Sequence, residues 1–378
     1  MKRVEEQWRR RSVLWLRGVR RAGKTFLAQS LREIEYFDCE LPSVRRAMED
    51  PEAFLRGLGR RRIVLDEVHR LPNPSEMLKV AADHFPGVRI LATGSSTLGA
   101  SRRFRDTLAG RKTELWLTPM IEPDLAEFGN ADVSHRLLHG GLPPFFLSPQ
   151  PIEADFQEWM DAYWAKDIQE LFRLERRASF QRFFELLMAQ SGGIFEATKF
   201  TAACEVSRAS IANYLAVLES TSVALVLRPF STRRSNEIVS APKVYGFDTG
   251  FACVHRGWSS LRPDDRGRLW EHYVLNELAA RLQPGRLRYW RDKQGHEVDF
   301  IWVARGRSPV AIECKWSASD FDPANLRVFH RAYPHAELLV TTADATRGFT
   351  RRDADAEVRF CTLERLVSEL LPEADKGA

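Results

Sequence analysis

The segment at residues 18–25 constrains this chain more than any other, because it combines two glycines with a lysine and a hydroxyl at fixed spacing. It matches G-x-x-x-x-G-K-[ST], in which backbone N–H groups close around phosphates at the start of a helix. An apolar run at 12–16 precedes it and a helix-forming run at 26–34 follows it, as that pattern requires. The predicted nucleotide-binding residues are Gly18, Val19, Arg20, Arg21, Ala22, Gly23, Lys24 and Thr25.

A second apolar run ends in two adjacent carboxylates, Asp66 and Glu67, about 40 residues after the loop. Lys24 is predicted to reach the β- and γ-phosphates, and Thr25 and Asp66 to hold Mg²⁺. Glu67 is predicted to orient and deprotonate the attacking water. Each motif alone is compatible with an ordinary turn, but the two at this spacing predict Mg²⁺-dependent binding and hydrolysis of ATP.

Two further polar positions are candidates for catalysis. Small hydroxyl residues follow the apolar run at 90–92, and Ser95 is predicted to sense the γ-phosphate or the attacking water, with Thr93 and Ser96 as alternatives. Arg111 is predicted to neutralise transition-state charge, either within the chain or from a neighbouring copy. A strand-end turn and an arginine on the surface are the simpler interpretations of these positions.

The first third of the chain alternates short apolar runs with amphipathic ones, which predicts an α/β fold with a parallel sheet. A length of 378 residues favours two or three domains, and a composition of 44% hydrophobic and 28% charged residues excludes a disordered chain. The predicted strands are Ser12–Leu16, Tyr36–Cys39, Ile63–Asp66, Arg89–Thr93 and Thr113–Leu117.

Composition also excludes several classes of protein. Five scattered cysteines without CxxC spacing argue against a disulfide framework and a zinc site, and favour a reducing, cytoplasmic compartment. The charged N-terminus lacks the apolar stretch of a signal peptide, and no apolar run is long enough to span a bilayer. The net charge of +5 permits contact with nucleic acid, but it is equally compatible with an arginine-rich surface.

A Pro- and Gly-rich stretch at 139–151 predicts a boundary, after which the pattern is mostly helical to residue 219. Residues 198–228 are interpreted as a winged helix-turn-helix, with helices at 199–204 and 208–219 and wing strands after them. Docking to a protein is the alternative use of such a module. The residues predicted to face outward, toward DNA, are Arg208, Ser210, Asn213 and Tyr214 on the second helix and Arg233 and Arg234 in the wing.

The C-terminal part contains Asp299, Glu313 and Lys315, which fit the D…ExK pattern of PD-(D/E)xK nucleases. A hairpin centred on Gly306 would place Asp299 opposite Glu313 after a helix predicted at 267–282, and two facing carboxylates call for a cation such as Mg²⁺. In this interpretation Lys315 activates water and Glu271 supplies a further carboxylate. Ordinary surface charges, or a nuclease-like fold that only docks DNA or a partner, are the alternatives.

The ordered series of motifs resembles prokaryotic AAA-superfamily ATPases with a C-terminal domain of unknown function, type 4143. It includes LDEVHRLPN at 65–73, LAGR at 108–111, HGGLPPF at 139–145, AYWAKDIQEL at 162–171, KVYGFDTG at 243–250 and AIECK at 311–315. The resemblance covers nearly the whole chain. It implies an AAA-like P-loop core at 1–145, a helical and winged-helix module at 146–248, and an α/β restriction-endonuclease-like domain at 249–378.

Three functions are compatible with these features. The leading hypothesis is ATP hydrolysis, with Mg²⁺, coupled to a conformational change that acts on DNA or on a partner protein. The second is a nucleotide switch that binds ATP without significant turnover, and the third is an ATP-gated, metal-dependent DNA nuclease. The partners left open are DNA, another protein and further copies of the same chain, but no membrane.

Overall fold

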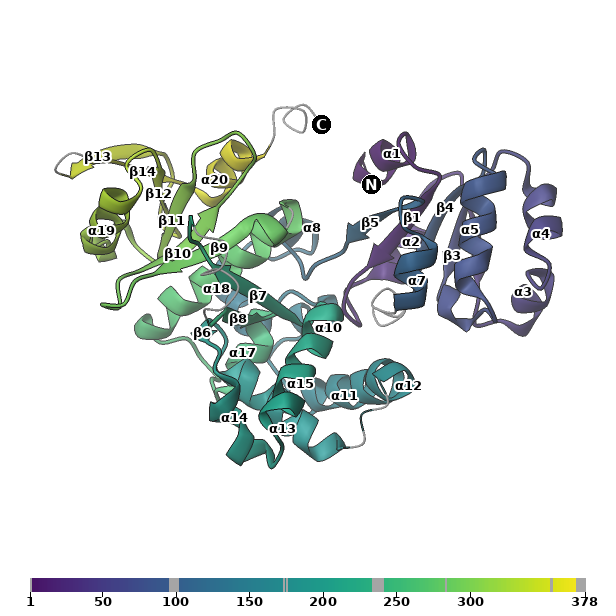
Figure 1. Ribbon diagram of the computed structural model, residues 1–378, viewed down its shortest axis with the longest axis horizontal. Coiled ribbons are helices and arrows are strands. Elements are labelled where there is room, and N and C mark those ends of the chain that lie inside the picture. Colours follow the sequence, from purple (N-terminus) through teal and green to yellow (C-terminus); the bar gives the residue numbers. More distant parts are fainter. Residues whose placement is uncertain are drawn as a thin grey trace.

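The structure is a computed structural model, which describes residues 2–94, 102–172, 174, 176–232, 241–282, 284–353 and 356–371. Figure 1 shows the first sheet and its helices at the right, a group of helices at the bottom, and the second sheet at the left. The mixed α/β architecture with an N-terminal parallel sheet confirms the predicted fold class.

The first sheet has the strand order β2-β3-β4-β1-β5, and every neighbouring pair is parallel. Its strands lie within a residue of the predicted ranges: β1 Val13–Arg17, β2 Glu35–Asp38, β3 Arg62–Asp66, β4 Arg89–Thr93 and β5 Lys112–Trp116. The helices around it are α1 Lys2–Trp8, α2 Lys24–Gln29, α3 Pro42–Ala47, α4 Pro51–Leu58, α5 Pro74–His84 and α7 Arg102–Thr107. Because β4 lies between β1 and β3, its carboxyl end falls between the two predicted nucleotide motifs.

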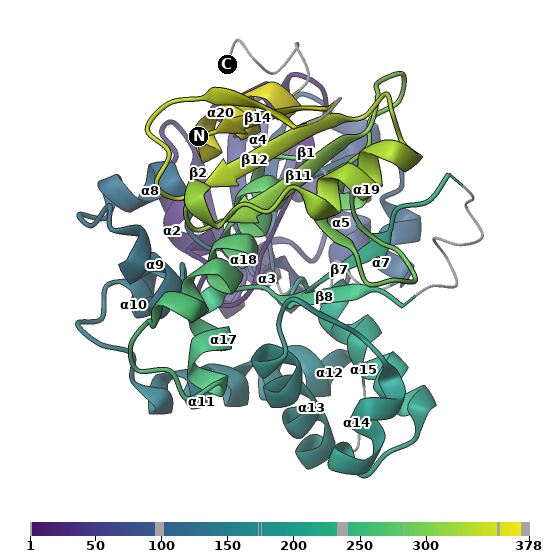
Figure 2. The ribbon, with the colours of Figure 1, turned by 90° about the vertical axis from the view of Figure 1, so that its left-hand side faces the viewer.

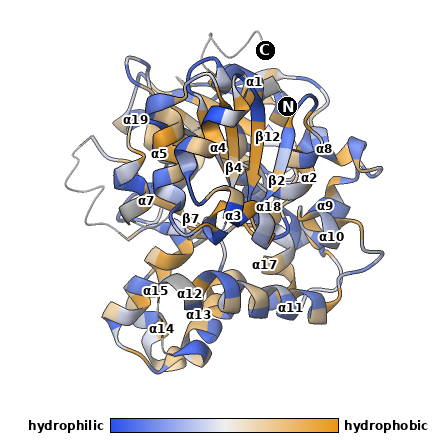
Figure 3. Ribbon diagram, turned by 90° about the vertical axis from the view of Figure 1, so that its right-hand side faces the viewer, coloured by the Kyte–Doolittle hydropathy of each residue, from blue (hydrophilic) through white to orange (hydrophobic). Residues whose placement is uncertain are grey.

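The central strands of this sheet are apolar along their whole length because helices cover both faces. Successive side chains of β1 point to opposite faces, so Val13 and Trp15 belong to one apolar cluster while Leu14 and Leu16 belong to another. In Figure 3, β4 is coloured as hydrophobic along much of its length. This double burial explains why continuous apolar runs, rather than alternating ones, mark these strands in the sequence.

A second group of helices follows β5. They are α8 Glu122–Glu127, α9 Val133–His139, α10 Pro143–Phe146, α11 Glu153–Tyr163, the π-helix Trp164–Ile168, α12 Gln169–Phe172, α13 Arg177–Ala189, α14 Ala197–Cys204 and α15 Arg208–Ser220. The last two lie where the sequence predicts a helix-turn-helix, and Glu205 makes the turn between them in the left-handed region (φ 54°). Tyr214 was wrongly predicted to face solvent: it is buried and its ring contacts Phe180 and Phe183.

The second sheet has nine strands in the order β13-β14-β12-β11-β10-β9-β7-β8-β6. They are β6 Gly193–Ile194, β7 Ala224–Pro229, β8 Lys243–Gly246, β9 Leu287–Arg291, β10 Glu297–Trp302, β11 Val310–Lys315, β12 Glu337–Thr342, β13 Phe349–Asp353 and β14 Ala356–Cys361. β7 pairs with β8 and also with β9, so the predicted wing strands are continuous with the C-terminal sheet. In Figure 2, β11 and β12 lie above the helices α13–α15.

Four helices pack around the second sheet: α17 Thr249–His255, α18 Pro263–Arg281, α19 Ala324–Ala332 and α20 Leu363–Leu370. The helix predicted at 267–282 is the C-terminal part of α18, which is 19 residues long and contains seven Asp, Glu or Arg residues. Among the described residues, no helix is both long and apolar enough to cross a bilayer.

The stretch predicted to be a boundary, 139–151, is packed rather than free at its start. Arg136 and Asp248 are 0% and 1% exposed and form an ion pair of 3.6 Å, and the N–H of Gly141 donates to Asp248 Oδ2 at 2.6 Å. Gly140 has φ 85°, and a Cβ built there would lie 2.0 Å from Asp248 Oδ1. The HGG and FDTG motifs therefore form one buried junction between α9 and α17.

Two histidines, of which His272 is buried and His255 is half-buried, make the stability of this fold sensitive to acid. Burial lowers the pKa of His255 from 6.5 to about 4 and that of His272 to about 3. Since both pKa values are depressed in the folded state, their contribution is complete above pH 6.5 and is lost as the pH falls toward 4. We expect the free energy of unfolding, measured with urea, to fall between pH 7 and pH 4.5, and to fall less in His255→Leu. Equal pH slopes in the two proteins would contradict this assignment.

Candidate nucleotide site

A cavity of about 1000 Å³ lies at the carboxyl edge of the first sheet. One wall consists of the loop at 18–25 and the residues that follow β3 and β4, and the other consists of residues from α8, the start of α10 and the π-helix. Its size is that of a pocket for a small organic ligand. The cavity therefore lies between the first sheet and the helices that follow it in the chain.

Local geometry explains the two glycines of the loop. A Cβ on Gly18 would lie 2.5 Å from the carbonyl oxygen of Leu117, so only glycine permits this approach to the residue after β5. Gly23 has φ 95°, in the left-handed region that favours glycine. Lys24, the first residue of α2, donates from Nζ to the carbonyl oxygens of Gly18 at 2.9 Å and Val19 at 3.1 Å. Burial lowers the pKa of Lys24, and the charge of Glu67 partly opposes that effect.

The carboxylate that ends β3 is held by hydroxyl groups from the two neighbouring strands. Asp66 is 3% exposed, and it accepts from Tyr36 Oη at 2.5 Å and from Thr93 Oγ1. Thr93 also accepts from the N–H of Glu67 at 3.2 Å, so it links the ends of β4 and β3. Ser95, the residue predicted to sense the γ-phosphate, and its alternative Ser96 lie outside the described residues. Tyr36 carries no recognisable motif and was missed by sequence reasoning.

Glu67 has a backbone conformation that is unusual for its residue type, with φ 51°. Its Oε2 lies 3.0 Å from Nδ1 of His69. Although burial raises the pKa of Glu67, its hydrogen bond with His69 and the charges of Lys24 and Arg20 bring that pKa below the ordinary value. The side chain is therefore an ionised carboxylate at neutral pH. It directly follows β3 and lines the same cavity as Lys24.

The loop at 18–25 is tied to the second group of helices by polar contacts. Arg20 Nε lies 3.2 Å from Asp167 Oδ2, and Arg21 Nη2 lies 2.5 Å from Glu158 Oε1. Trp159 Nε1 donates to the carbonyl oxygen of Arg20 at 3.0 Å. The four variable positions of the motif are thus not arbitrary: two of them hold the loop against α11 and the π-helix.

Apolar contacts strengthen the same connection. Val19 and Ala22 belong to the hydrophobic core that also contains Trp159 of α11. The π-helix that follows α11 places Lys166 and Asp167 at the cavity wall. Single π-turns of this kind recur at functional sites because they redirect side chains without ending the helix. The sequence motif at 162–171 had no assigned role, and the structure places part of it beside the loop.

Arg111 lies at the opposite edge of the first sheet from the loop. Lys112, the next residue, pairs with Val13 at the amino end of β1, whereas the loop follows the carboxyl end of that strand. Four strand residues separate these levels by about 13 Å. Arg111 Nε instead lies 2.8 Å from Asp83 Oδ1. This arrangement does not fit the predicted neutralisation of transition-state charge within the same chain. That role of Arg111 would require a second copy of the chain.

Models of three protein families match successive parts of the chain. An AAA domain matches residues 10–125, the domain of unknown function DUF8612 matches 130–262, and the domain of unknown function DUF4143 matches 266–358. The uncharacterized proteins Rv2008c of Mycobacterium tuberculosis and Mb2031c of Mycobacterium bovis are both 30% identical over 330 residues, which is 83% of this chain and 72% of theirs. This chain belongs to the family of P-loop AAA-domain proteins with a C-terminal DUF4143 domain.

Among solved structures, this AAA-domain protein resembles a signal transduction ATPase with a tetratricopeptide repeat sensor from Pyrococcus horikoshii. The TM-score is 0.28 at 11% identity, over 75% of this chain and 45% of that one. The family assignment depends instead on the sequence matches and on the parallel sheet that carries the nucleotide motifs. The AAA model covers that sheet in full, from before β1 to after β5.

The residues predicted to contact DNA differ in their surroundings. Arg208 and Asn213 are exposed on α15. Ser210 is only half exposed, because its N–H donates to Oγ of Ser207, which caps the helix, at 3.1 Å. Arg233 and Arg234 lie outside the described residues. A DNA contact by α15 therefore stays a prediction that depends on two exposed side chains.

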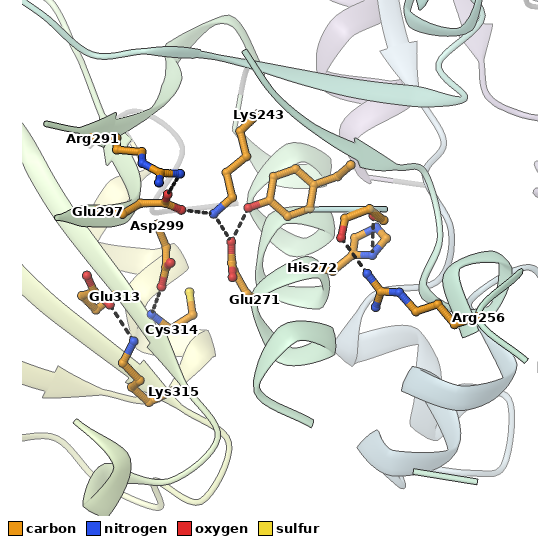
Figure 4. Close-up of polar contacts among 12 residues, drawn as sticks. Lys243, Arg256, Glu271, His272, Arg291, Glu297, Asp299, Glu313, Cys314 and Lys315 are labelled. Carbon is orange, nitrogen blue, oxygen red and sulfur yellow. Dashed lines mark hydrogen bonds and ion pairs between the residues drawn. The ribbon is translucent and has the colours of Figure 1, made fainter. Parts of the chain in front are cut away.

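The four residues predicted to form a nuclease site lie close together on the second sheet and α18 (Figure 4). Phe300 of β10 pairs with Ile312 of β11, so Asp299 and Glu313 occupy the next level of the same ladder, as the hairpin centred on Gly306 predicts. Asp299 Oδ2 accepts from the N–H of Cys314 at 2.8 Å, and Lys315 Nζ lies 2.8 Å from Glu313 Oε2. Burial and the charge of Asp299 raise the pKa of Glu313 to about 8.

An additional lysine, which sequence reasoning missed, neutralises this group. Lys243 Nζ, at the start of β8, lies 2.7 Å from Glu271 Oε1 and 2.6 Å from Glu297 Oε1, and Tyr245 Oη also donates to Glu271. Among the described residues, no three His, Cys, Asp or Glu side chains are arranged to hold a metal ion. Glu271 and Asp299 accept hydrogen bonds from protein donors, whereas Oε1 of Glu313 is buried without a hydrogen-bond partner. A metal ion and nuclease activity at this group therefore stay predictions.

Proposed function

We propose that this protein binds ATP together with Mg²⁺ and hydrolyses it in the cavity at the carboxyl edge of the first sheet. The observation that carries the proposal is that Lys24, at the start of α2, and Glu67, directly after β3, line the same end of that cavity, next to the buried Asp66. An amino group, a buried carboxylate and an ionised, partly exposed carboxylate are the groups that phosphoryl transfer to water requires.

Each group has a distinct part in this proposal. The loop N–H groups and Lys24 bind and orient the phosphates, and Thr25 and Asp66 supply the oxygen ligands that Mg²⁺ prefers when it also binds phosphates. Bound Mg²⁺ neutralises the negative charge of the phosphate oxygens. Glu67 is ionised, because its pKa is held below the ordinary value, and takes the proton of the attacking water. The hydroxyl of Thr93 positions the carboxylate of Asp66 and the backbone of Glu67.

The contacts of the loop support a coupling between nucleotide state and the second group of helices. When the loop is held in place by bound phosphates, Arg20 and Arg21 are held with it, so their ion pairs with Asp167 and Glu158 pass the state of the loop to the π-helix and α11. The helices that would move include α15, where Arg208 and Asn213 are exposed. We propose that this motion is the output of hydrolysis, acting on DNA at α15.

Replacing Asp167 with Asn tests the coupling. In the wild type, ATP should slow amide hydrogen exchange in residues 153–168, because the loop holds α11 and the π-helix when its phosphates are bound. In Asp167→Asn the protection at 153–168 should be smaller at saturating ATP, because the neutral side chain attracts Arg20 less. Glu205→Gln, which removes an exposed ion pair with Arg182 on the same group of helices, serves as the control and should behave as the wild type.

The direct test of the proposed function is steady-state phosphate release from ATP and Mg²⁺, with and without duplex DNA, by the wild type and Lys24→Ala. Lys24→Ala should lose ATP binding by about 100-fold or more, because its charge-assisted bonds to phosphate disappear. DNA should stimulate release in the wild type and not in Arg208→Ala. ATP binding without turnover would support the nucleotide switch instead, and unchanged ATP binding by Lys24→Ala would refute the site.

A further inference from the structure

The wall of the cavity that faces the phosphate loop contains an apolar part, which lies beside the charged side chains of Asp124 and Glu127. Phe26 and Leu147 line this cavity. At 74% and 59%, they are among the most exposed large hydrophobic side chains in the described part of the chain. Met120, Phe128 and Pro143 line it as well. A cavity with cations and N–H groups at one end and apolar side chains at the other is amphipathic, as is a nucleotide.

The apolar wall is held in a fixed position by the buried junction between α9 and α17. The N–H of Met120 donates to the carbonyl oxygen of Gly141 at 2.7 Å, and Arg136 Nε donates to the carbonyl oxygen of Met120 at 2.9 Å. Gly141 is in turn bound to Asp248. These bonds fix the segment after β5 against the start of α10, so that the wall is preformed rather than assembled by the ligand.

Phe128 contributes the aromatic surface of the wall. Its ring packs partly against a small cluster of Met120, Leu125 and Phe146, and the remainder of the side chain is accessible from the cavity. The side chains of this wall come from the segments on either side of α8 and from the start and end of α10, none of which belongs to the sheet that carries the phosphate loop. The cavity is thus completed only when both groups of elements are in place.

We propose that this apolar wall, formed by Met120, Phe128, Pro143 and Leu147, is the subsite for the base of the bound nucleotide. The proposal rests on the proposed function, because the base is the flat, weakly polar end of the molecule whose phosphates occupy the loop. An inorganic phosphate or polyphosphate would use the loop alone. Base stacking on aromatic and aliphatic side chains contributes affinity that is independent of the phosphate contacts.

Isothermal titration of ATP and of tripolyphosphate with the wild type, Phe128→Ala and Leu147→Ala tests this subsite. Each variant should raise the Kd for ATP, by about tenfold for Phe128→Ala, and leave the Kd for tripolyphosphate unchanged. Leu147 is so exposed that its replacement leaves the fold intact even if Phe128→Ala does not fold. Leu41→Ala is the matched control, because Leu41 is 50% exposed and does not line the cavity.

The outcomes separate this inference from the function on which it rests. An unchanged Kd for ATP in Leu147→Ala and in folded Phe128→Ala would overturn the base subsite while ATP binding by the wild type stands. Equal weakening of ATP and tripolyphosphate would also overturn it, since the wall would then act on the phosphate loop. A wild type that binds neither ligand would overturn the proposed function, and the subsite with it.

Discussion

Glu67→Gln is expected to lower the steady-state rate of phosphate release by about 100- to 10,000-fold while ATP still binds. The amide keeps the size of the side chain and can still lie beside His69, but it cannot accept the proton of the attacking water. Lys24, Thr25 and Asp66 are unchanged in this variant, so the phosphate loop keeps its contacts. Phosphate release and ATP affinity should be measured on the same preparation, because the expected effect falls on the first and spares the second.

The matched control for Glu67→Gln is Glu35→Gln. Glu35 belongs to the same sheet, but it lies at the amino end of β2, where its Oε2 is 2.8 Å from Arg61 Nη1 on the surface. Its replacement should leave turnover within a factor of two of the wild type. If Glu67→Gln retained full turnover, the water would be activated by another group and the assignment of Glu67 would be wrong.

Asp248→Asn is expected to lower the free energy of unfolding by about 3–5 kcal/mol. The substitution leaves the guanidinium of Arg136, which is 0% exposed, in the interior without its counter-charge. The carbonyl oxygen of Met120 and the hydroxyl of Thr249 remain as acceptors at 2.9 Å each, but neither carries a charge. Urea unfolding at neutral pH measures the change.

Glu52→Gln is the control for the buried pair. It removes an ion pair with Arg56 in α4, whose two side chains are 73% and 63% exposed, and it should cost less than about 1 kcal/mol. A loss of similar size in the two variants would show that the Arg136–Asp248 pair contributes no more than a surface pair. The junction between α9 and α17 would then depend on its apolar contacts alone.

Much of the first sheet is predictable from the sequence because its signals are local. Each of its central strands contains a run of apolar residues buried on both faces. Each run ends at polar or glycine residues, which mark the end of the strand in the sequence. The phosphate loop is equally local, since eight consecutive residues carry it. The hairpin that brings Asp299 to the level of Glu313 follows from one glycine, because strand register is set by the turn.

Other features are invisible in the sequence because their partners lie far apart in it. Tyr214 appears outward-facing by helical spacing, yet it is buried, because α13 packs across that side of α15. Lys243 lies 28 residues from Glu271 and 54 from Glu297, and no local pattern indicates that its ammonium group neutralises both. The stretch at 139–151 has the composition of a linker, although Gly140 is required by the close approach of Asp248 and Gly141 by that of Arg136.

The sequence by itself determined which residues are predicted to bind phosphate and that they follow a strand, because that prediction depends on eight neighbouring residues. Only the tertiary structure decided what surrounds the loop. Arg20 and Arg21 meet Asp167 and Glu158 across more than 130 positions, and the apolar wall is brought there by a buried junction. Such contacts depend on how whole elements pack, and packing brings together residues whose separation along the chain carries no signal.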